Sequence, residues 1–270
     1  MSPDEARARL AALGFDHDSA GILFDHFAAA ERTGRAGHGF RRIEWLETWT
    51  ELRVEARPSR LVSEPGYERW AGNGALGYLV LDAVVCAQLA RPPDHCRLVV
   101  CDGTFPTGVL GHWVRRLAEG GLVALLTATS PRRLGHPAGG PKLAGTNPLA
   151  VAVPSSDGRQ VVADVSMGNL THGDVLAGRA SEDELAPFGG EHAHKAFALA
   201  VALQLLVDAL TPSDDFGAVL VVARPEADPV PAFRELAAGV RLPGDRSADN
   251  TMRTVPVSKA DGRAGEARTS

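Results

Sequence analysis

The stretch RLVVCDGTFPTGVLGHWVRRLAEGGLVALLT, residues 97–127, brings an alternation of strand and helix into the chain. It begins with the short apolar run 97–101, which is typical of a buried strand. The segment 109–118 then places apolar residues at helical spacing, and 122–127 is a second apolar run. Strand, helix and strand in this order favour a sheet covered by helices, so the predicted fold class is α/β.

Upstream of this stretch the sequence predicts mainly helices. Ser2-Pro3-Asp4-Glu5 has a serine N-cap, a proline at the first helical position and a glutamate at the third. Two further helices are expected from about Ser19 and over 43–52, whereas 58–72 is rich in turn residues. We therefore expect a helical N-terminal part over residues 1–72.

Downstream, the pattern predicts an α/β part over residues 73–243, the candidate cofactor-binding part. A buried helix is expected over 75–89 and the longest helix over 191–210. Between them, two apolar runs around a Ser-Ser-Asp-Gly turn predict a hairpin, formed by 149–153 and 160–165. The polar segment 244–270 is expected to be a mobile tail.

The composition excludes several classes of partner. The chain has 270 residues and a formal net charge of −5, which gives no electrostatic footprint for nucleic acid or an anionic membrane. Its three cysteines form neither a CxxC pair nor an even framework, so a reduced, cytoplasmic chain is the simplest account. The longest apolar stretch, 196–206, is too short to span a bilayer, and no membrane partner is expected.

Residues 72–77, Gly-Asn-Gly-Ala-Leu-Gly, match the GxGxxG pattern of dinucleotide-binding loops. That pattern requires a buried strand directly before its first glycine, and the preceding Pro65-Gly66-Tyr67-Glu68-Arg69-Trp70 is not expected to form one. Close packing at the start of a helix explains the glycines more simply than binding of a pyrophosphate.

Four motifs follow one another between about residues 35 and 210. They are Gly37-His38-Gly39-Phe40-Arg41-Arg42; Pro137-Ala138-Gly139-Gly140 leading into Gly145-Thr146-Asn147-Pro148; Asp164-Val165-Ser166; and Pro187-Phe188-Gly189-Gly190 followed by His194-Lys195-Ala196-Phe197-Ala198-Leu199. In order and spacing the set resembles the type-2 malate/L-lactate dehydrogenases, a family that includes ureidoglycolate dehydrogenase and cyclic imine-2-carboxylate reductases. The resemblance implies a non-Rossmann NAD(P)-binding fold with a mixed or antiparallel sheet, and a homodimer with active sites near the subunit interface.

The chemistry of such enzymes suits two residues of the first motif. Reduction of a 2-oxo or 2-imino acid needs a cation for the carboxylate, a proton source and a rigid cofactor cradle. Arg42 can grip a carboxylate through two hydrogen bonds, and the resemblance makes it the substrate arginine. His38 lies one helical turn earlier and can donate to the same substrate; the alternative is a loop histidine that caps the third helix. His38 and Arg42 are the catalytic candidates.

The same resemblance assigns cofactor binding, with NAD or NADP as the cofactor. The implied positions are Ser130, Thr146, Asn147, Asp164, Val165, Ser166, His194 and Lys195. Lys195 stands at a helix start, where the helix dipole disfavours a cation, so contact with cofactor hydroxyl or phosphate groups explains it better than a solvated charge. The nearby histidines of Glu191-His192-Ala193-His194 do not share a helical face and lack a third ligand, so no metal site is expected.

The chain also departs from the family it resembles. Gly37 stands where the family has serine. The family's Asn-Ser-x-His-x-Gly segment, whose histidine takes part in proton transfer, aligns near 102–108 and places Pro106 at that histidine. The interval between Ser166 and Pro187 is several tens of residues shorter than in the family, and the C-terminal arm is short. We therefore expect a divergent, shortened member.

These observations predict an NAD(P)H-dependent reductase of a small imine-2-carboxylate or 2-oxo acid, with a place in a specialised biosynthetic pathway. The alternative is a degenerate homologue that performs a non-redox step or binds a ligand or partner. Ser130, Asp164 and Lys195 favour cofactor binding, whereas Pro106 favours altered chemistry. The remaining proton sources are His38, a water near Asp102, or a cyclic iminium substrate that enters already protonated.

Overall fold

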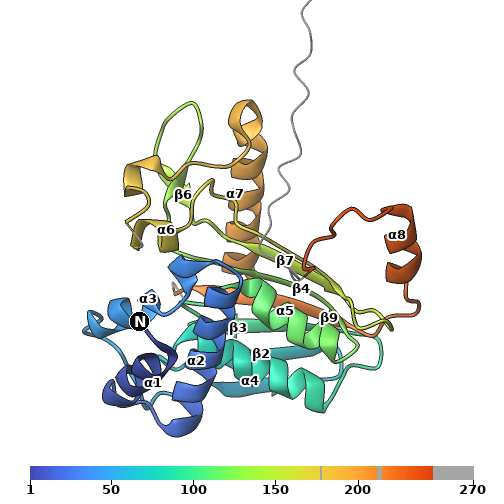
Figure 1. Cartoon of the computed structure of the whole chain (residues 1–270), viewed down its shortest axis with the longest axis horizontal. Coiled ribbons are helices and arrows are strands. Elements are labelled where there is room, and N and C mark those ends of the chain that lie inside the picture. Colours follow the sequence, from blue (N-terminus) through green and yellow to red (C-terminus); the bar gives the residue numbers. More distant parts are fainter. Residues whose placement is uncertain (177, 212–214, 246–270) are drawn as a thin grey trace, which may run out of the picture.

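The computed structural model describes residues 1–176, 178–211 and 215–245, and its centre is one large sheet (Figure 1). Seven strands follow the order β1-β2-β3-β9-β4-β7-β8, and β5 and β6 form a separate pair. The strands are β1 (Ser59–Ser63), β2 (Tyr67–Ala71), β3 (Cys96–Asp102), β4 (Val123–Ala128), β5 (Leu134–Gly135), β6 (Lys142–Ala144), β7 (Leu149–Val153), β8 (Val161–Val165) and β9 (Gly217–Ala223). Only β2 and β3 pair in parallel, which confirms the predicted α/β fold with a mixed, mainly antiparallel sheet.

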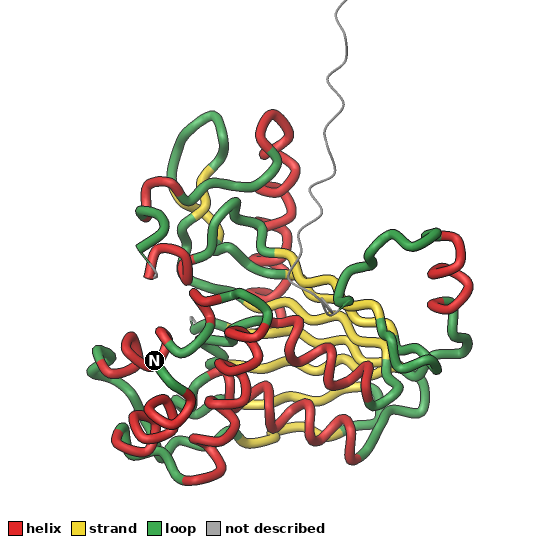
Figure 2. Tube along the Cα trace, in the orientation of Figure 1, coloured by secondary structure: helices red, strands yellow, loops and turns green. Residues whose placement is uncertain are grey.

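Helices cover one face of this sheet. Figures 1 and 2 show α4 and α5 lying side by side in front of the strands, with α2 at one end of this pair. The helices are α1 (Pro3–Ala12), α2 (His17–Arg32), α3 (Arg41–Glu47), α4 (Gly77–Ala90), α5 (Leu110–Glu119), α6 (His172–Leu176), α7 (Ala193–Leu210) and α8 (Val230–Leu236), with short 3-10 turns η1 (Ala36–His38), η2 (Glu182–Glu184) and η3 (Gly190–His192). One hydrophobic core joins helices and sheet, with Phe27, Tyr78 and Trp113 packed with Val99 and Leu220.

The stretch at 97–127 forms β3, α5 and β4, as its pattern predicts. The two strands are not neighbours, because β9 lies between them and pairs antiparallel with both. A strand from near the C-terminal end of the described chain therefore completes the centre of the sheet. Its position depends on a contact far along the sequence, which local periodicity does not encode.

The N-terminal part is helical as expected, up to Glu47. Ser2 caps α1 by accepting a hydrogen bond of 3.2 Å from the Glu5 amide. The third helix ends earlier than its pattern predicts, and β1 and β2 follow in the segment that we expected to consist of turns. The predicted mobile tail lies outside the described residues from residue 246 onward.

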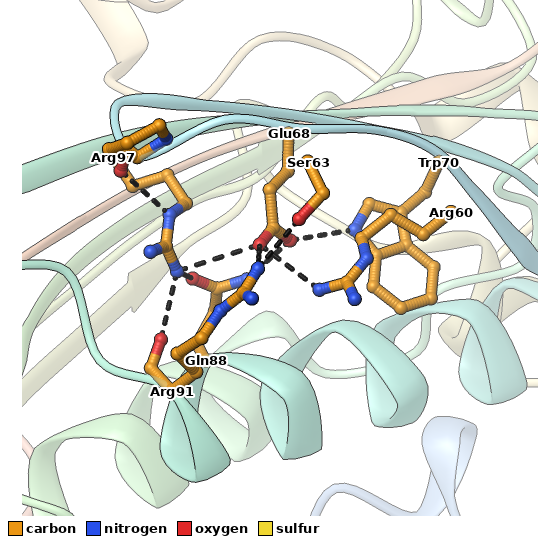
Figure 3. Close-up of polar contacts among 8 residues, drawn as sticks. Arg60, Ser63, Glu68, Trp70, Gln88, Arg91 and Arg97 are labelled. Carbon is orange, nitrogen blue, oxygen red and sulfur yellow. Dashed lines mark hydrogen bonds and ion pairs between the residues drawn. The ribbon is translucent and has the colours of Figure 1, made fainter.

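Strand β2 carries a completely buried carboxylate, Glu68 (Figure 3). Its Oε2 accepts hydrogen bonds from Trp70 Nε1 at 3.1 Å and Gln88 Nε2 at 2.8 Å. Its Oε1 accepts one from Arg60 at 3.3 Å and lies 3.6 Å from Arg97 Nη1. Because a buried charge is tolerated only when it is paired and hydrogen-bonded, this network links β1, β2, α4 and β3 into one unit.

Strand β2 also corrects the expectation about residues 72–77. It ends directly before Gly72, so a strand does precede the glycines, contrary to the sequence argument. A Cβ on Gly72 would lie 2.2 Å from the Gly103 carbonyl oxygen, and one on Gly77 would lie 2.8 Å from that of Pro106. The glycines thus let the 103–106 loop approach closely, in line with a packing role.

Helix α7 stands beside the small β5-β6 pair, above the main sheet in Figure 1. A second hydrophobic cluster fills this region, with Leu134, Ala144, Met167, Ala200 and Leu203. Together η3 and α7 span the 21 residues Gly190–Leu210, in which an 18-residue window has a mean hydropathy of 1.5 and is 33% buried. By length and composition alone such a helix could cross a membrane; it extends well beyond the apolar run that we judged too short.

Candidate active site

A cavity of about 330 Å³ lies where η1, the 105–109 loop and the 171–179 segment meet. Six of the ten residues predicted for the site line it, and they come from segments far apart in the sequence. They are His38, Arg42, Ser130, Thr146, Asp164 and Ser166. The fold thus brings both predicted catalytic residues together with four of the predicted cofactor-binding residues.

Arg42 is a buried cation at this cavity. It is 5% exposed on α3, and its Nε donates a hydrogen bond of 2.9 Å to the Gly37 carbonyl oxygen. Its guanidinium carbon lies 5.3 Å from the centroid of the Trp45 ring, and among the described residues no carboxylate forms an ion pair with it. Burial and then nearby Arg133 lower its pKa, which in an arginine still leaves the group charged. Arg42 therefore offers a desolvated cation to an anionic ligand.

His38 ends η1 beside this arginine. Its Nδ1 is buried and has no hydrogen-bond partner. Burial, followed by the charges of Arg42 and Arg35, lowers the pKa of His38 to about 3. The imidazole is thus neutral near pH 7 and holds an unused polar atom, which suits it to hydrogen bonding with a ligand in the cavity.

Asp164 reaches the cavity from the edge strand β8 and binds two partners there. Its Oδ2 accepts hydrogen bonds from Arg35 Nη1 at 2.8 Å and from the Gly111 amide at 2.9 Å. A Cβ on Gly111 would lie 3.0 Å from the carboxylate, so glycine is needed for this approach. The next residue, Val165, is 45% exposed and does not line the cavity, because successive strand residues point to opposite faces.

Three of the predicted residues, Ser130, Thr146 and Ser166, form a wall of hydroxyl groups in the cavity. The Thr146 amide donates to Ser130 Oγ at 3.1 Å, and the two hydroxyl oxygens lie 3.4 Å apart. Ser166 Oγ accepts a hydrogen bond of 3.2 Å from the Gly168 amide. Because a hydroxyl group both donates and accepts hydrogen bonds, this wall can bind either an amide group or the hydroxyl groups of a ribose.

Asn147 lies behind this wall rather than in it. It is completely buried, and its Oδ1 accepts from the Ser130 amide at 3.2 Å. Its Nδ2 donates to the Ala200 carbonyl at 3.1 Å and to Gln204 Oε1 at 3.0 Å. Asn147 therefore fixes the Ser130 loop against α7. It positions a lining residue without lining the cavity itself.

His194 and Lys195 lie outside the cavity, exposed at the start of α7. The chain enters this helix through Gly189 and Gly190, both with positive φ (108° and 55°). The rings of His192 and His194 have centroids 6.2 Å apart, and the described residues contain no group of three potential metal ligands.

The sequence did not identify several lining residues. These are Arg35, Arg133, His172, Asp174 and Arg179, three of which belong to the segment between Ser166 and Pro187. The resemblance gave no guidance there, because the four motifs that carry it lie outside this interval. Charged side chains in a segment without apolar periodicity were the only signal available.

The position expected for the missing histidine does border the cavity. Pro106 lines it together with Phe105 and Thr107. Asp102, near which we placed a possible water, does not line it, and its Oδ2 accepts a hydrogen bond of 2.6 Å from Arg69. The groups that can donate or accept a proton at this cavity are therefore two histidines, His38 and His172, and two aspartates that are each hydrogen-bonded to an arginine, Asp164 and Asp174.

Comparison with known proteins identifies the family of the chain. Residues 4–186 match the family described as malate/L-lactate dehydrogenase. A Δ1-pyrroline-2-carboxylate/Δ1-piperideine-2-carboxylate reductase of Pseudomonas putida is 29% identical over 220 residues, covering 70% of this chain and 63% of that protein. A (2R)-3-sulfolactate dehydrogenase (NADP+) of Chromohalobacter salexigens is 25% identical over 232 residues, covering 76% and 68%. The chain thus spans about two thirds of the length of these relatives.

Solved structures show the same fold. A Δ1-piperideine-2-carboxylate reductase from Pseudomonas syringae superposes with a TM-score of 0.78 at 23% identity, covering 90% of this chain and 89% of that one. A malate dehydrogenase from Entamoeba histolytica gives a TM-score of 0.74 at 17% identity, covering 91% and 86%. At these identities the likeness concerns the fold alone. Together with the sequence match over residues 4–186, it shows that the chain belongs to the malate/L-lactate dehydrogenase family.

Proposed function

We propose that this protein is an NAD(P)H-dependent reductase of a small imine-2-carboxylate or 2-oxo acid. One observation carries the proposal: the substrate-side pair His38 and Arg42 faces the same cavity as Ser130, Thr146 and Asp164. An unpaired buried cation beside a wall of hydroxyl groups is the arrangement that a carboxylate substrate and a nicotinamide amide would require. The relatives described above act on substrates of this kind.

The residues present fit such a cofactor. The cavity is large enough for a nicotinamide ring and a small acid, because ligand pockets begin at about 300 Å³. The bound cofactor, NAD or NADP, would supply hydride at this place. Arg42 would hold the substrate carboxylate, and Ser130 and Thr146 would orient the amide. Outside the cavity, Lys195 could hold a phosphate or ribose hydroxyl.

Pro106 makes imines the favoured substrates in this proposal. A ketone must gain a proton on an oxygen that becomes strongly basic during reduction, and general acid catalysis contributes about 10²–10⁴-fold. A cyclic iminium ion can enter already protonated and needs only hydride. A chain that has proline in place of the family's histidine therefore loses less rate with a cyclic iminium ion than with a ketone.

Pro106 also supports the competing function, which is a non-redox step or the binding of a ligand or partner by a divergent homologue. Two outcomes separate the proposals. Titration of the protein with NADH and NADPH, followed by nicotinamide fluorescence, should show saturable binding of at least one. Absence of binding by both would refute the reductase. Cofactor binding with no turnover of either substrate class would favour the non-redox function.

We further propose that two chains associate through α7. This helix exposes Leu199, Leu205 and Leu206, which are 40%, 62% and 45% exposed. Exposed leucines gathered on one helix are typical of a surface that is buried in an interface, and the family resemblance implies a homodimer with active sites near that interface. In a sedimentation experiment, Leu205→Glu should shift the protein toward monomer, whereas Leu236→Glu, at an exposed position on α8, should not.

The enzyme is proposed to act in the cytoplasm.

A further inference from the structure

The segment between Ser166 and Pro187 brings a second histidine to the cavity. His172 is the first residue of α6 and lines the cavity with His38 and Arg42. Its position is fixed by a very close backbone approach: a Cβ on Gly37 would lie 2.4 Å from the Gly173 carbonyl group. Helix α6 is therefore packed directly on η1, which carries His38.

The polar contacts of this imidazole are incomplete. Its Nδ1 is buried and has no hydrogen-bond partner. The nearest carboxylate oxygen is Glu182 Oε1 on η2, 4.0 Å from Nδ1. A small movement of that side chain would form a carboxylate–imidazole pair, which fixes a proton on Nδ1 and turns Nε2 toward the ligand. The same carboxylate oxygen lies 3.6 Å from Arg133 Nε, which keeps it near His172.

We infer that His172 is the general acid of the proposed reduction, in place of the histidine that Pro106 removes, and that Glu182 positions it. The inference rests on the proposed function. Among the groups that line the cavity, His38 is the competitor. The carboxylate that acts on the pKa of His38 is Asp174, which already accepts a hydrogen bond of 3.1 Å from Arg179. The carboxylate beside His172 is less engaged, because Glu182 lies 3.6 Å from Arg133, beyond hydrogen-bond distance.

The charges around His172 explain how it would work. In the free protein, burial and then Arg133 and Arg42 lower its pKa to about 4, while Glu182 acts in the opposite direction. A substrate carboxylate bound at Arg42 would neutralise one of the two opposing cations. The pKa of His172 would then rise, and the imidazole would take up a proton as the substrate binds.

The step balances with the reductant that the proposed function names. When bound, the reduced cofactor would supply a hydride, with its electron pair, to the carbonyl carbon of the 2-oxo acid and would itself be oxidised. The π pair of the C=O bond moves to oxygen and forms an O–H bond with the proton from Nε2. His172 is left neutral with its proton on Nδ1, beside Glu182, and regains the lost proton from solvent.

The first test needs no turnover. In ¹⁵N-histidine-labelled protein, the His172 signals are those missing from His172→Asn, and their titration gives its pKa. Saturation with oxamate, an unreactive 2-oxo acid analogue, should raise that pKa by at least one unit. Glu182→Gln should reduce the rise. No change in the His172 pKa with oxamate would overturn the inference.

The second test compares substrates. His172→Asn should lower kcat for pyruvate by about 10²–10⁴-fold, and for Δ1-piperideine-2-carboxylate only a few-fold. His95→Asn, an exposed position outside the cavity, is the matched control and should change neither. If His38→Ala shows the ketone-selective loss and His172→Asn does not, His38 is the acid and the inference is wrong. A parent protein inactive on both substrates would refute the proposed function itself.

Discussion

Arg35 donates a hydrogen bond of 2.8 Å to Asp164, and so ties the turn after α2 to the edge strand β8 at the rim of the cavity. The two residues are 129 positions apart. Asp164 is only 9% exposed in its side chain, and it also accepts a hydrogen bond from Gly111 near the start of α5. A carboxylate at a helix N-terminus is favoured by the helix dipole, so the pair stabilises three segments at once.

This geometry predicts unequal effects for the two residues. Arg35 is 44% exposed in its side chain, and Arg35→Ala should lower the free energy of unfolding by about 1 kcal/mol or less. Asp164→Ala also leaves the buried Gly111 amide without an acceptor and should cost about 2–3 kcal/mol. Urea denaturation of both variants measures the difference. A larger loss for Arg35→Ala would contradict the assignment.

Four poorly solvated histidines predict sensitivity to acid. The pKa of His38 is lowered to about 3, those of His112 and His172 to about 4, and that of His26 well below its usual value, in each case chiefly by burial. Below pH 6.5 the unfolded chain binds protons that the folded chain does not. The free energy of unfolding should therefore fall as the pH drops from about 6.5 toward 4.

His26 provides the check on this pH dependence. Its Nε2 accepts a hydrogen bond of 3.0 Å from the Val109 amide, which requires a neutral ring. Urea midpoints measured across this pH range should fall less steeply for His26→Gln than for the parent, although the variant is less stable at pH 8. Equal slopes would show that His26 does not contribute to the acid sensitivity.

Lys195 should contribute to cofactor affinity although it lies outside the cavity. Loss of one charge-assisted hydrogen bond costs about 1.5–3 kcal/mol, or roughly ten- to a hundred-fold in affinity. Lys195→Ala should therefore weaken NADH or NADPH binding by that factor in a fluorescence titration. Lys142→Ala changes another exposed lysine, on β6, and should bind the cofactor like the parent. If both variants bind as tightly as the parent, the role of Lys195 is refuted.

Gly74 tests the packing role of residues 72–77. Its φ is 85°, and a Cβ there would lie 2.8 Å from Arg53 Cδ. Because the left-handed conformation costs other residues about 1–2 kcal/mol, Gly74→Ala should lower the melting temperature by several degrees and leave cofactor affinity unchanged. Gly66→Ala, where φ is not positive and nothing lies within 4 Å, should be neutral. Lost cofactor binding with unchanged melting would revive the dinucleotide-loop interpretation.

Substrate preference tests the consequence of Pro106. We expect Δ1-piperideine-2-carboxylate to be reduced with a higher kcat/KM than its open-chain 2-oxo acid analogue. The iminium needs no enzymic proton, whereas the ketone depends on a proton from His172, whose pKa in the free protein is lowered to about 4. Arg42→Gln should lower kcat/KM for both by a similar factor, since both carry the carboxylate. Steady-state assays with each cofactor measure the ratio. Equal kcat/KM values for the two substrates in the parent protein would contradict the expectation.

The sequence predicted those parts that depend on local pattern or on the family motifs. Periodicity located β3, α5, β4 and α7, and the motifs named six residues of the cavity. Periodicity did not reveal β1 and β2. In β2, partly buried residues alternate with buried ones, and one of the buried residues is the charged Glu68, so the strand does not form an apolar run. Arg133 and His172 were missed because tertiary contacts, and no local spacing, bring them to the cavity.

The approach of Gly37 and Gly173 has a consequence for how the chain can change. Any side chain at 37 would place its Cβ 2.4 Å from the Gly173 carbonyl group, and a side chain at 173 would collide with Gly37 in return. Neither glycine can therefore be replaced unless the backbone of the other segment moves. The two positions are coupled, and a substitution at either one is tolerated only together with a change in how α6 packs on η1.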